Sequence, residues 1–142
     1  MRIGTFYRNR EESCISGGAG CGVVYLSGCD MHCAYCLVYD ISQGGKGVPA
    51  TPRQLADLLL SLGQWGVSHI SLANVEPSAG EVVEAITIAR EKGLALPLLN
   101  NFNGYAPAAL TRRLLPYFQG YIMDFKYADA ALGERLSAAP AY

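Results

Sequence analysis

Three cysteines within one short segment are the residues of this sequence best suited to chemistry. Cys29, Cys33 and Cys36 follow a C-x3-C-x2-C spacing. Three thiolates held so close together suit a soft metal ion or an iron–sulfur cluster. A cubane cluster contains four irons, so three cysteine ligands would leave one iron open. An open coordination position separates a catalytic metal site from a closed structural one.

Two other uses of these cysteines remain open. A structural zinc site needs a fourth ligand, which Cys14 or Cys21 could supply. Cys33 and Cys36 alone have the C-x-x-C spacing of a thioredoxin-like redox pair, although this use leaves Cys29 without a role. Five cysteines cannot all pair within one chain, so metal or cofactor ligation is expected rather than a disulfide framework.

Short apolar runs and helix-capping signals predict the elements that must position this segment. Thr51, Pro52 and Gln54 form a capping box with proline at the first helical position, and a stripe of leucines follows. Ser78 is expected to cap the next helix against Glu81. The expected strands cover residues 22–26, 69–73, 95–99 and 121–123, and the expected helices begin near residues 52, 78, 107 and 129.

The spacing of the strands predicts an α/β fold with parallel strands. Strands two to four begin at residues 69, 95 and 121, so successive starts lie 26 residues apart. A strand–helix unit repeated at this interval indicates crossover helices between parallel strands. Four such units fit a partial (β/α) TIM-like barrel or an open parallel sheet. Residues 1–22, which are polar and glycine-rich, are expected to form an N-terminal loop or extension, and residues 23–142 the domain.

The polar clusters of the sequence follow these strands. In both architectures the functional site lies at the C-terminal ends of the strands. The cysteine segment follows the first strand, and the other clusters occupy residues 74–78, 100–104 and 124–126. We therefore expect all four clusters to meet in one site.

Composition excludes several classes of protein. The 142 residues are 51% hydrophobic and 16% charged, with a net charge of -1, which argues against disorder and against phosphate-driven binding of nucleic acid. No apolar run approaches the roughly 20 residues of a membrane helix, and the N-terminus lacks the apolar region of a secretory signal. We expect a cytoplasmic protein with neither nucleic-acid nor membrane partners.

The cysteine motif and its surroundings resemble a known superfamily. The spacing of the three cysteines, with Tyr35 before the last one and Leu26-Ser27-Gly28 before the first, resembles the signature of radical S-adenosylmethionine (SAM) proteins. Further strings resemble the branch of pyruvate formate-lyase-activating-enzyme-like proteins, and the resemblance runs from about residue 11 to the end of the chain. These strings are residues 11–17, 40–43, 97, 101–105 and 124–127.

The resemblance implies an enzyme with two cofactors. Cys29, Cys33 and Cys36 would ligate a [4Fe-4S] cluster, and SAM would chelate the fourth iron. One electron from the reduced cluster would cleave SAM to a 5′-deoxyadenosyl radical, which abstracts hydrogen from the substrate. The branch further implies an oxidoreductase that acts on a glycine of a partner glycyl radical enzyme. A low-potential donor such as flavodoxin or ferredoxin would supply the electron.

The resemblance also implies residues that bind SAM. Tyr35 would lie near the adenine. Residues 74–77 stand where the superfamily often has Gly-Gly-Glu-Pro, but here Asn74 and Val75 replace the two glycines, which allow the closest backbone approach. The SAM-binding residues expected from these matches are Tyr35, Asn74, Glu76, Asn101, Asn103, Asp124 and Lys126.

The sequence is shorter than the family pattern. Radical SAM domains resemble partial barrels of six units, whereas this sequence supplies about four. The chain is thus expected to be C-terminally truncated relative to the family: a fragment, a degenerate copy, or one half of a barrel that a partner completes. The last strand would form an exposed sheet edge, which favours self-association. The alternative function is a noncatalytic iron–sulfur or zinc module.

Overall fold

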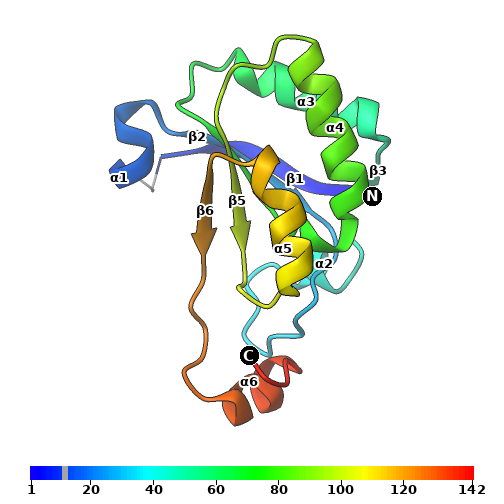
Figure 1. Ribbon diagram of the computed structural model, residues 1–142, viewed down its shortest axis with the longest axis vertical. Coiled ribbons are helices and arrows are strands. Elements are labelled where there is room, and N and C mark those ends of the chain that lie inside the picture. Colours follow the sequence, from blue (N-terminus) through cyan, green and yellow to red (C-terminus); the bar gives the residue numbers. More distant parts are fainter. Residues whose placement is uncertain (11–12) are drawn as a thin grey trace.

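The fold is mixed α/β, built around one sheet. A computed structural model describes residues 1–10 and 13–142, and within them it forms a six-stranded sheet with the order β3-β1-β2-β4-β5-β6 (Figure 1). The strands are β1 (Arg2–Asn9), β2 (Cys21–Leu26), β3 (Val48–Pro49), β4 (Ile70–Ala73), β5 (Leu98–Phe102) and β6 (Gly120–Met123).

Helices connect the strands. The longer ones are α3 (Pro52–Gly63), α4 (Ala79–Glu91), α5 (Ala108–Leu114) and α6 (Ala130–Ser137). The shorter ones are α1 (Ser13–Ser16), η1 (Gly17–Ala19), α2 (Tyr39–Ser42), η2 (Glu76–Ser78) and η3 (Leu115–Tyr117). Figure 1 shows α1 and α6 toward opposite ends of the molecule.

The strand directions confirm the expected parallel architecture. Strands β2, β4, β5 and β6 are mutually parallel, and β1 runs antiparallel to both of its neighbours. One row of paired residues crosses the parallel strands through Val24, Leu72, Asn100 and Tyr121. Parallel pairing places the C-terminal ends of all four strands at one edge of the sheet.

The N-terminal residues correct one expectation. The prediction of a loop over residues 1–22 was wrong for Arg2–Asn9, which form β1. This strand pairs along its length with β2, for example Phe6 with Val24. The burial pattern of β1 is mostly exposed, so it lacks the apolar alternation that identifies a strand. Residues 13–19 add a short α-helix and a 3-10 turn. The domain boundary between residues 22 and 23 stays a prediction.

Strand β5 lies three residues later than expected. The prediction covered residues 95–99, whereas β5 begins at Leu98 and includes two asparagines. The Arg90 guanidinium donates hydrogen bonds of 2.6 and 2.8 Å to the carbonyl oxygens of Leu94 and Leu96, which fixes this segment as a connection. Polar residues inside β5 are the reason that an apolar pattern placed the strand too early.

Helix caps were predicted in part. At α3 the capping box is present, with the Gln54 amide hydrogen bonded to the Thr51 hydroxyl and the Gln54 side chain accepting from the Thr51 backbone. The expected cap of Ser78 against Glu81 was wrong, because the Ser78 side chain makes no capping hydrogen bond. The Glu81 carboxylate instead accepts from the Met1 amino group at 2.5 Å.

The main core lies between the sheet and the helices that cover it. The leucine stripe of α3 packs against α4 and against apolar side chains of β2, β4 and β5, and Leu55, Leu59 and Leu62 are fully buried. A second, smaller cluster contains Met31 and Tyr127 and lies beside the cysteine segment. The site is therefore packed separately from the main core.

Across residues 1–10 and 13–142, none of the helices combines the length and the apolar character needed to cross a membrane.

Replacing the capping residue of α3 tests the helix start. Thr51→Ala removes the hydroxyl that accepts from the Gln54 amide, and we expect the free energy of unfolding to fall by about 1 kcal/mol. Urea titration followed by circular dichroism measures this change. Thr87→Ala is the matched control, because Thr87 lies inside α4 and should change stability by less than about 0.5 kcal/mol. Equal losses in the two variants would contradict the cap.

Candidate metal centre

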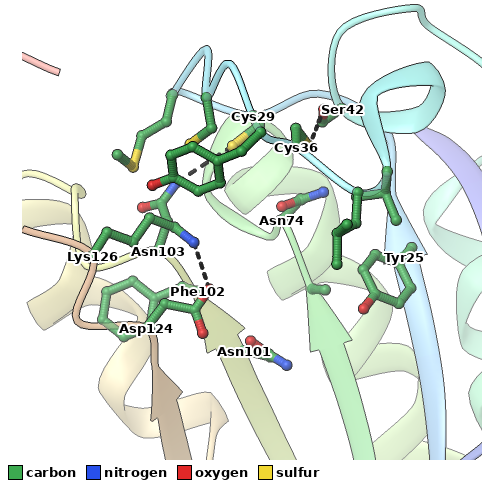
Figure 2. Close-up of a pocket in the computed structure, with 16 residues that line it drawn as sticks. Tyr25, Cys29, Cys36, Ser42, Asn74, Asn101, Phe102, Asn103, Asp124 and Lys126 are labelled. Carbon is green, nitrogen blue, oxygen red and sulfur yellow. Dashed lines mark hydrogen bonds and ion pairs between the residues drawn. The ribbon is translucent and has the colours of Figure 1, made fainter. Parts of the chain in front are cut away.

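The predicted site residues gather around one cavity at the C-terminal ends of the parallel strands. The cavity measures about 330 Å³, and all three cysteines line it. Figure 2 shows Cys29 and Cys36 above the strand ends, Asn74 and Tyr25 on one side, and Asp124 and Lys126 on the other. The other predicted residues that line it are Tyr35, Asn74, Asn101, Asn103, Asp124 and Lys126. Nine of the ten predicted site residues therefore line one cavity, and their roles stay predictions.

The cysteine loop, residues 29–36, is fixed by polar contacts at its thiols and backbone. The Asn103 side-chain amide donates to Cys29 Sγ at 3.4 Å, and Cys36 Sγ lies 3.2 Å from the Ser42 hydroxyl. Gln43 Nε2 donates to the Met31 carbonyl oxygen at 2.8 Å. Burial raises the pKa of the Cys29 thiol. Two of the three sulfurs thus already have a hydrogen-bonding neighbour.

The donor set fits a cluster by its chemistry. Within the described part of the chain, no three cysteine, histidine or carboxylate side chains are grouped to hold one metal ion. A cubane cluster makes a different demand, because each thiolate ligates its own iron. Three thiols around one cavity meet this demand, and hydrogen bonds such as those between these thiols and Asn103 or Ser42 are among the contacts that set the potential of iron–sulfur centres.

The structure corrects the zinc alternative that used Cys14 or Cys21 as a fourth ligand. Cys21 is the first residue of β2, and Cys29 follows the end of that strand. With a rise of about 3.3 Å per residue, the strand alone separates them by more than the reach of any single ion. Cys14 lies in α1, before β2, at the left side of the upper half of the molecule, whereas α6 lies at the lower end (Figure 1). Both cysteines therefore lie outside the site.

A pair of charged side chains just after β6 forms one wall of the cavity. The Lys126 ammonium donates to Asp124 Oδ2 at 2.8 Å (Figure 2). Burial opposes the charge of Lys126, but the hydrogen bond and the negative charge of Asp124 outweigh it and raise its pKa above the ordinary value. Lys126 is consequently cationic at neutral pH. Asp124 and Lys126 therefore form an ion pair with each other just after β6.

Glu76 is the predicted residue that the cavity does not include. Its carboxylate accepts from the Asn100 side-chain amide at 2.8 Å, and burial raises its pKa. Asn100 is 1% exposed and its Oδ1 atom has no hydrogen-bond partner among the described residues. Glu76 thus anchors the turn after β4 to β5, and its expected contact with SAM stays a prediction.

Asn74 takes the backbone conformation that favours glycine. Its φ of 62° lies in the left-handed region, which asparagine tolerates better than most residues. Its side-chain amide donates to the Leu26 carbonyl oxygen at 3.1 Å and so joins the turn to the end of β2. The replacement of glycine by asparagine at this position is therefore compatible with a tight turn at the cavity.

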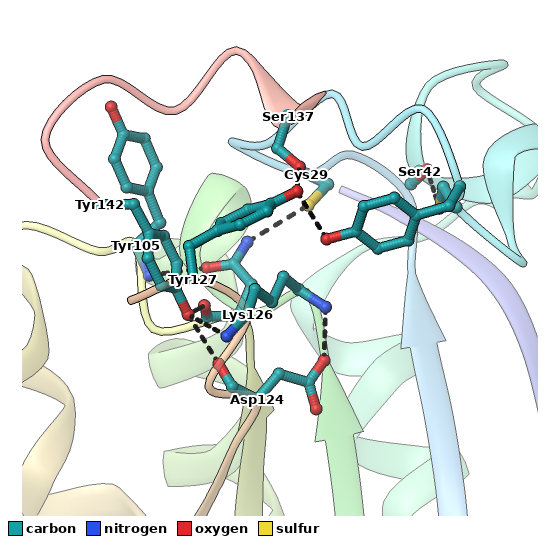
Figure 3. Close-up of polar contacts among 11 residues, drawn as sticks. Cys29, Ser42, Tyr105, Asp124, Lys126, Tyr127, Ser137 and Tyr142 are labelled. Atoms are coloured by element: carbon teal, nitrogen blue, oxygen red, sulfur yellow. Dashed lines mark hydrogen bonds and ion pairs between the residues drawn. The ribbon is translucent and has the colours of Figure 1, made fainter. Parts of the chain in front are cut away.

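Sequence reasoning missed a chain of hydroxyl groups beside the cavity. The Tyr35 and Tyr127 hydroxyls lie 2.6 Å apart, and the Tyr127 hydroxyl lies 2.6 Å from Ser137 Oγ (Figure 3). Burial and then the hydrogen bond with Tyr127 raise the pKa of Tyr35 to about 12. Tyr127 stood in the matched string 124–127, but no spacing signal linked it to Tyr35. Ser137 gave no signal at all.

The raised pKa of Glu76 predicts a pH-dependent stability. A carboxyl group whose folded pKa exceeds its ordinary 4.5 binds more protons in the folded state. Its contribution is therefore present at low pH and is lost as the pH rises from about 4.5 through the folded pKa. Glu76→Gln should remove this fall in urea midpoints, whereas Glu84→Gln on the exposed face of α4 should retain it. Parallel curves for all three proteins would contradict the buried carboxyl.

Comparison with known proteins bears on the cysteine loop directly. The sequence model of the 4Fe-4S single cluster domain matches residues 16–131, which include the cysteine loop and all strands from β2 to β6. This domain is found in radical SAM-related proteins. No curated protein matches the chain. Because the match covers most of the sequence and all three cysteines of the loop, the chain belongs to the 4Fe-4S single cluster domain family.

Proposed function

We propose that the chain is a radical SAM enzyme, in which Cys29, Cys33 and Cys36 hold a [4Fe-4S] cluster and SAM occupies the adjoining cavity. The observation that carries the proposal is the gathering of three thiols and six further predicted residues around that one cavity. When bound and reduced, the cluster supplies the electron for cleavage of a carbon–sulfur bond in SAM. The fold would then be a partial (β/α) barrel with about four of six units.

The cavity offers groups that match the parts of SAM. A cavity of about 330 Å³ is at the lower end of the usual range for small-molecule sites. The Lys126 ammonium and the amides of Asn101 and Asn103 suit a carboxylate, and Asp124 suits an amino group. The ring of Tyr35 lines the cavity, is half exposed and can stack against an adenine.

The substrate and electron donor would reach the site from its open side. Leu37, which follows the last cysteine, is 100% exposed, and Tyr39 is 60% exposed. Exposed apolar side chains beside a site are typical of surfaces that bind other proteins. These observations support a protein substrate, such as the glycine of a glycyl radical enzyme, and a flavodoxin or ferredoxin as donor. Such partners would place the chain in the cytoplasm.

The sheet edge favours a second candidate, in which the chain is one half of a larger assembly. Strand β6 is the last strand of the described sheet. Its last residue, Met123, is 56% exposed, and Phe125, just beyond it, is 75% exposed. An edge strand with unpaired backbone groups and apolar side chains invites pairing with another chain. On this proposal the chain holds a cluster and associates through β6.

Electron paramagnetic resonance on the anaerobically reconstituted, dithionite-reduced protein tests the first candidate. We expect a [4Fe-4S]⁺ signal that shifts when SAM is added. Cys29→Ser, Cys33→Ser and Cys36→Ser should each abolish or strongly reduce the signal, because each removes a thiolate ligand. Cys14→Ser, at an exposed thiol outside the site, is the matched control and should keep it. Zinc retained in place of iron would refute the proposal.

A lysine variant separates cluster binding from SAM binding in the same experiment. Lys126→Met should leave the cluster signal unchanged and weaken SAM binding by about ten- to a hundredfold, as expected for a lost hydrogen bond to a charged group. Lys92→Met is the control. Lys92 forms an ion pair with Asp57 between α3 and α4, and this pair lies far from the cavity. A cluster signal that does not shift when SAM is added, in any variant, would instead support the second candidate, in which the chain is one half of a larger assembly.

Sedimentation velocity tests association through β6. We expect the wild-type chain to form a larger species as its concentration rises, and Met123→Lys to suppress it by placing a charge at the edge. Val48→Lys is the control, because Val48 is also exposed but lies in β3 at the opposite edge of the sheet. A wild-type chain that stays monomeric at high concentration would argue against a β6 interface.

A further inference from the structure

The cysteine loop is packed by the segment that follows β6. A small core joins Met31 of the loop to Tyr127 and Ala139, and Cys29 and Cys33 pack against it. This core shares no buried residue with the main core under α3 and α4. We call residues 127–142, which supply two of its three buried side chains, the C-terminal strap.

Backbone hydrogen bonds join the strap to the loop on both sides of the middle cysteine. The His32 amide donates to the Ser137 carbonyl oxygen at 2.8 Å, and the Ala34 amide donates to the Leu136 carbonyl oxygen at 2.8 Å. The end of α6 therefore runs alongside Cys33. These two bonds are lost whenever the strap moves away from the loop.

Side-chain hydroxyls fasten the same contact. The Tyr127 hydroxyl lies 2.6 Å from that of Ser137, on α6 (Figure 3), and 2.6 Å from that of Tyr35, on the loop. Tyr127 is 9% exposed, and its ring makes edge contacts with the rings of Tyr35 and Tyr142 at centroid distances of 6.5 and 5.4 Å. Removal of this one hydroxyl breaks both hydrogen bonds while the ring can stay in place.

The far end of the strap is held at the strand ends. The Tyr142 hydroxyl accepts from the Lys126 amide at 3.0 Å and lies 2.8 and 2.7 Å from the carbonyl oxygens of Asn103 and Asp124 (Figure 3). Tyr105 donates to the Pro140 carbonyl oxygen at 3.0 Å. The strap thus bridges the cysteine loop and the ends of β5 and β6.

We propose that Tyr127 is a positioning residue that latches the C-terminal strap over the cysteine loop, and that opening of the strap controls access to Cys29 and Cys33. The inference rests on the proposed cluster site for its purpose. Iron and sulfide must reach all three thiols during assembly. All three are partly exposed at the cavity, but Cys29 and Cys33 also pack against the strap core, so lifting of the strap exposes these two further. Closure then retains the cluster and keeps Tyr35 in place at the cavity.

The strap is built to open more easily than the rest of the fold. Its core holds three buried residues, and a unit with few buried apolar contacts opens locally at a lower free energy than the whole domain. The exposed residue Ala138, which ends α6, has a φ of 49° in the left-handed region that favours glycine. Ala138→Gly should relieve this strain and favour the closed strap, without loss of packing.

Two variants with opposite expected effects test the latch in the metal-free, full-length protein. Tyr127→Phe should raise amide hydrogen exchange at His32 and Ala34 by about tenfold, the change expected for the loss of one or two hydrogen bonds. Alkylation of Cys29 and Cys33 by iodoacetamide should accelerate in proportion. Ala138→Gly should slow both by about two- to fivefold, the net of relieved left-handed strain and added chain entropy.

Internal and external controls keep the test specific. Cys36 does not pack against the strap core, so its alkylation rate should stay constant in both variants. Tyr117→Phe, at a tyrosine in η3 remote from the loop, should change none of these rates. Thermal unfolding of each variant shows whether the main core is intact.

The outcomes also separate the latch from the proposed function. Unchanged exchange at His32 and Ala34 in Tyr127→Phe would overturn the latch, and so would faster exchange with constant alkylation of Cys29 and Cys33. In the iron-loaded protein, the release of iron to a chelator should follow the same order of variants. Failure to form any cluster would refute the proposed function, whereas the rates in the metal-free protein would still decide the latch.

Discussion

The parallel pairing of β2, β4, β5 and β6 is the constraint on which the site depends. Because the four strands run in one direction, every segment that follows a strand emerges at the same edge of the sheet. Residues more than 90 positions apart in the sequence, such as Cys29 and Asp124, consequently line one cavity. The connecting helices bury their apolar faces far from this edge, which leaves the edge free to carry polar side chains.

A sheet edge alone does not hold a loop of three cysteines. The loop leaves β2 at Gly28, whose φ of 101° allows the chain to turn sharply above Pro77. Beyond this turn, Gln43 and the C-terminal strap supply contacts that order the loop. The stability of the metal centre is therefore set by local contacts and differs from that of the sheet. Because the loop is held by local contacts, it can rearrange to accept a cofactor after folding while the sheet stays intact.

The sequence predicted what local patterns encode. The leucine stripe of α3, its capping box and the apolar strands β2, β4 and β6 each have a periodic or capping signal, and the cysteine spacing predicted three thiols that line one cavity. Strand β1 was not predicted because it is mostly exposed and shows no alternation of apolar and polar residues. Strand β5 was misplaced because its last residues are polar. Tyr127 and Glu76 form hydrogen bonds with residues far away in the sequence, Tyr35 and Asn100. A contact of this kind produces no spacing pattern from which it could be predicted.

The orientation of Glu76 changes the electrostatic role of the cavity wall. Since Glu76 binds Asn100 and does not line the cavity, Asp124 is the carboxylate that the described residues offer to a ligand there. Asp124 is already paired with Lys126, so this wall of the cavity is close to neutral. A ligand that carries both an amino and a carboxylate group can insert between the two side chains and give each a partner of opposite charge. A ligand with only one of these charges would leave Asp124 or Lys126 partly buried without a counter-charge, which is unfavourable. If SAM occupies the cavity as proposed, the ion pair would therefore favour this zwitterion over a simple anion or cation, through the two side chains that follow β6 at the cavity.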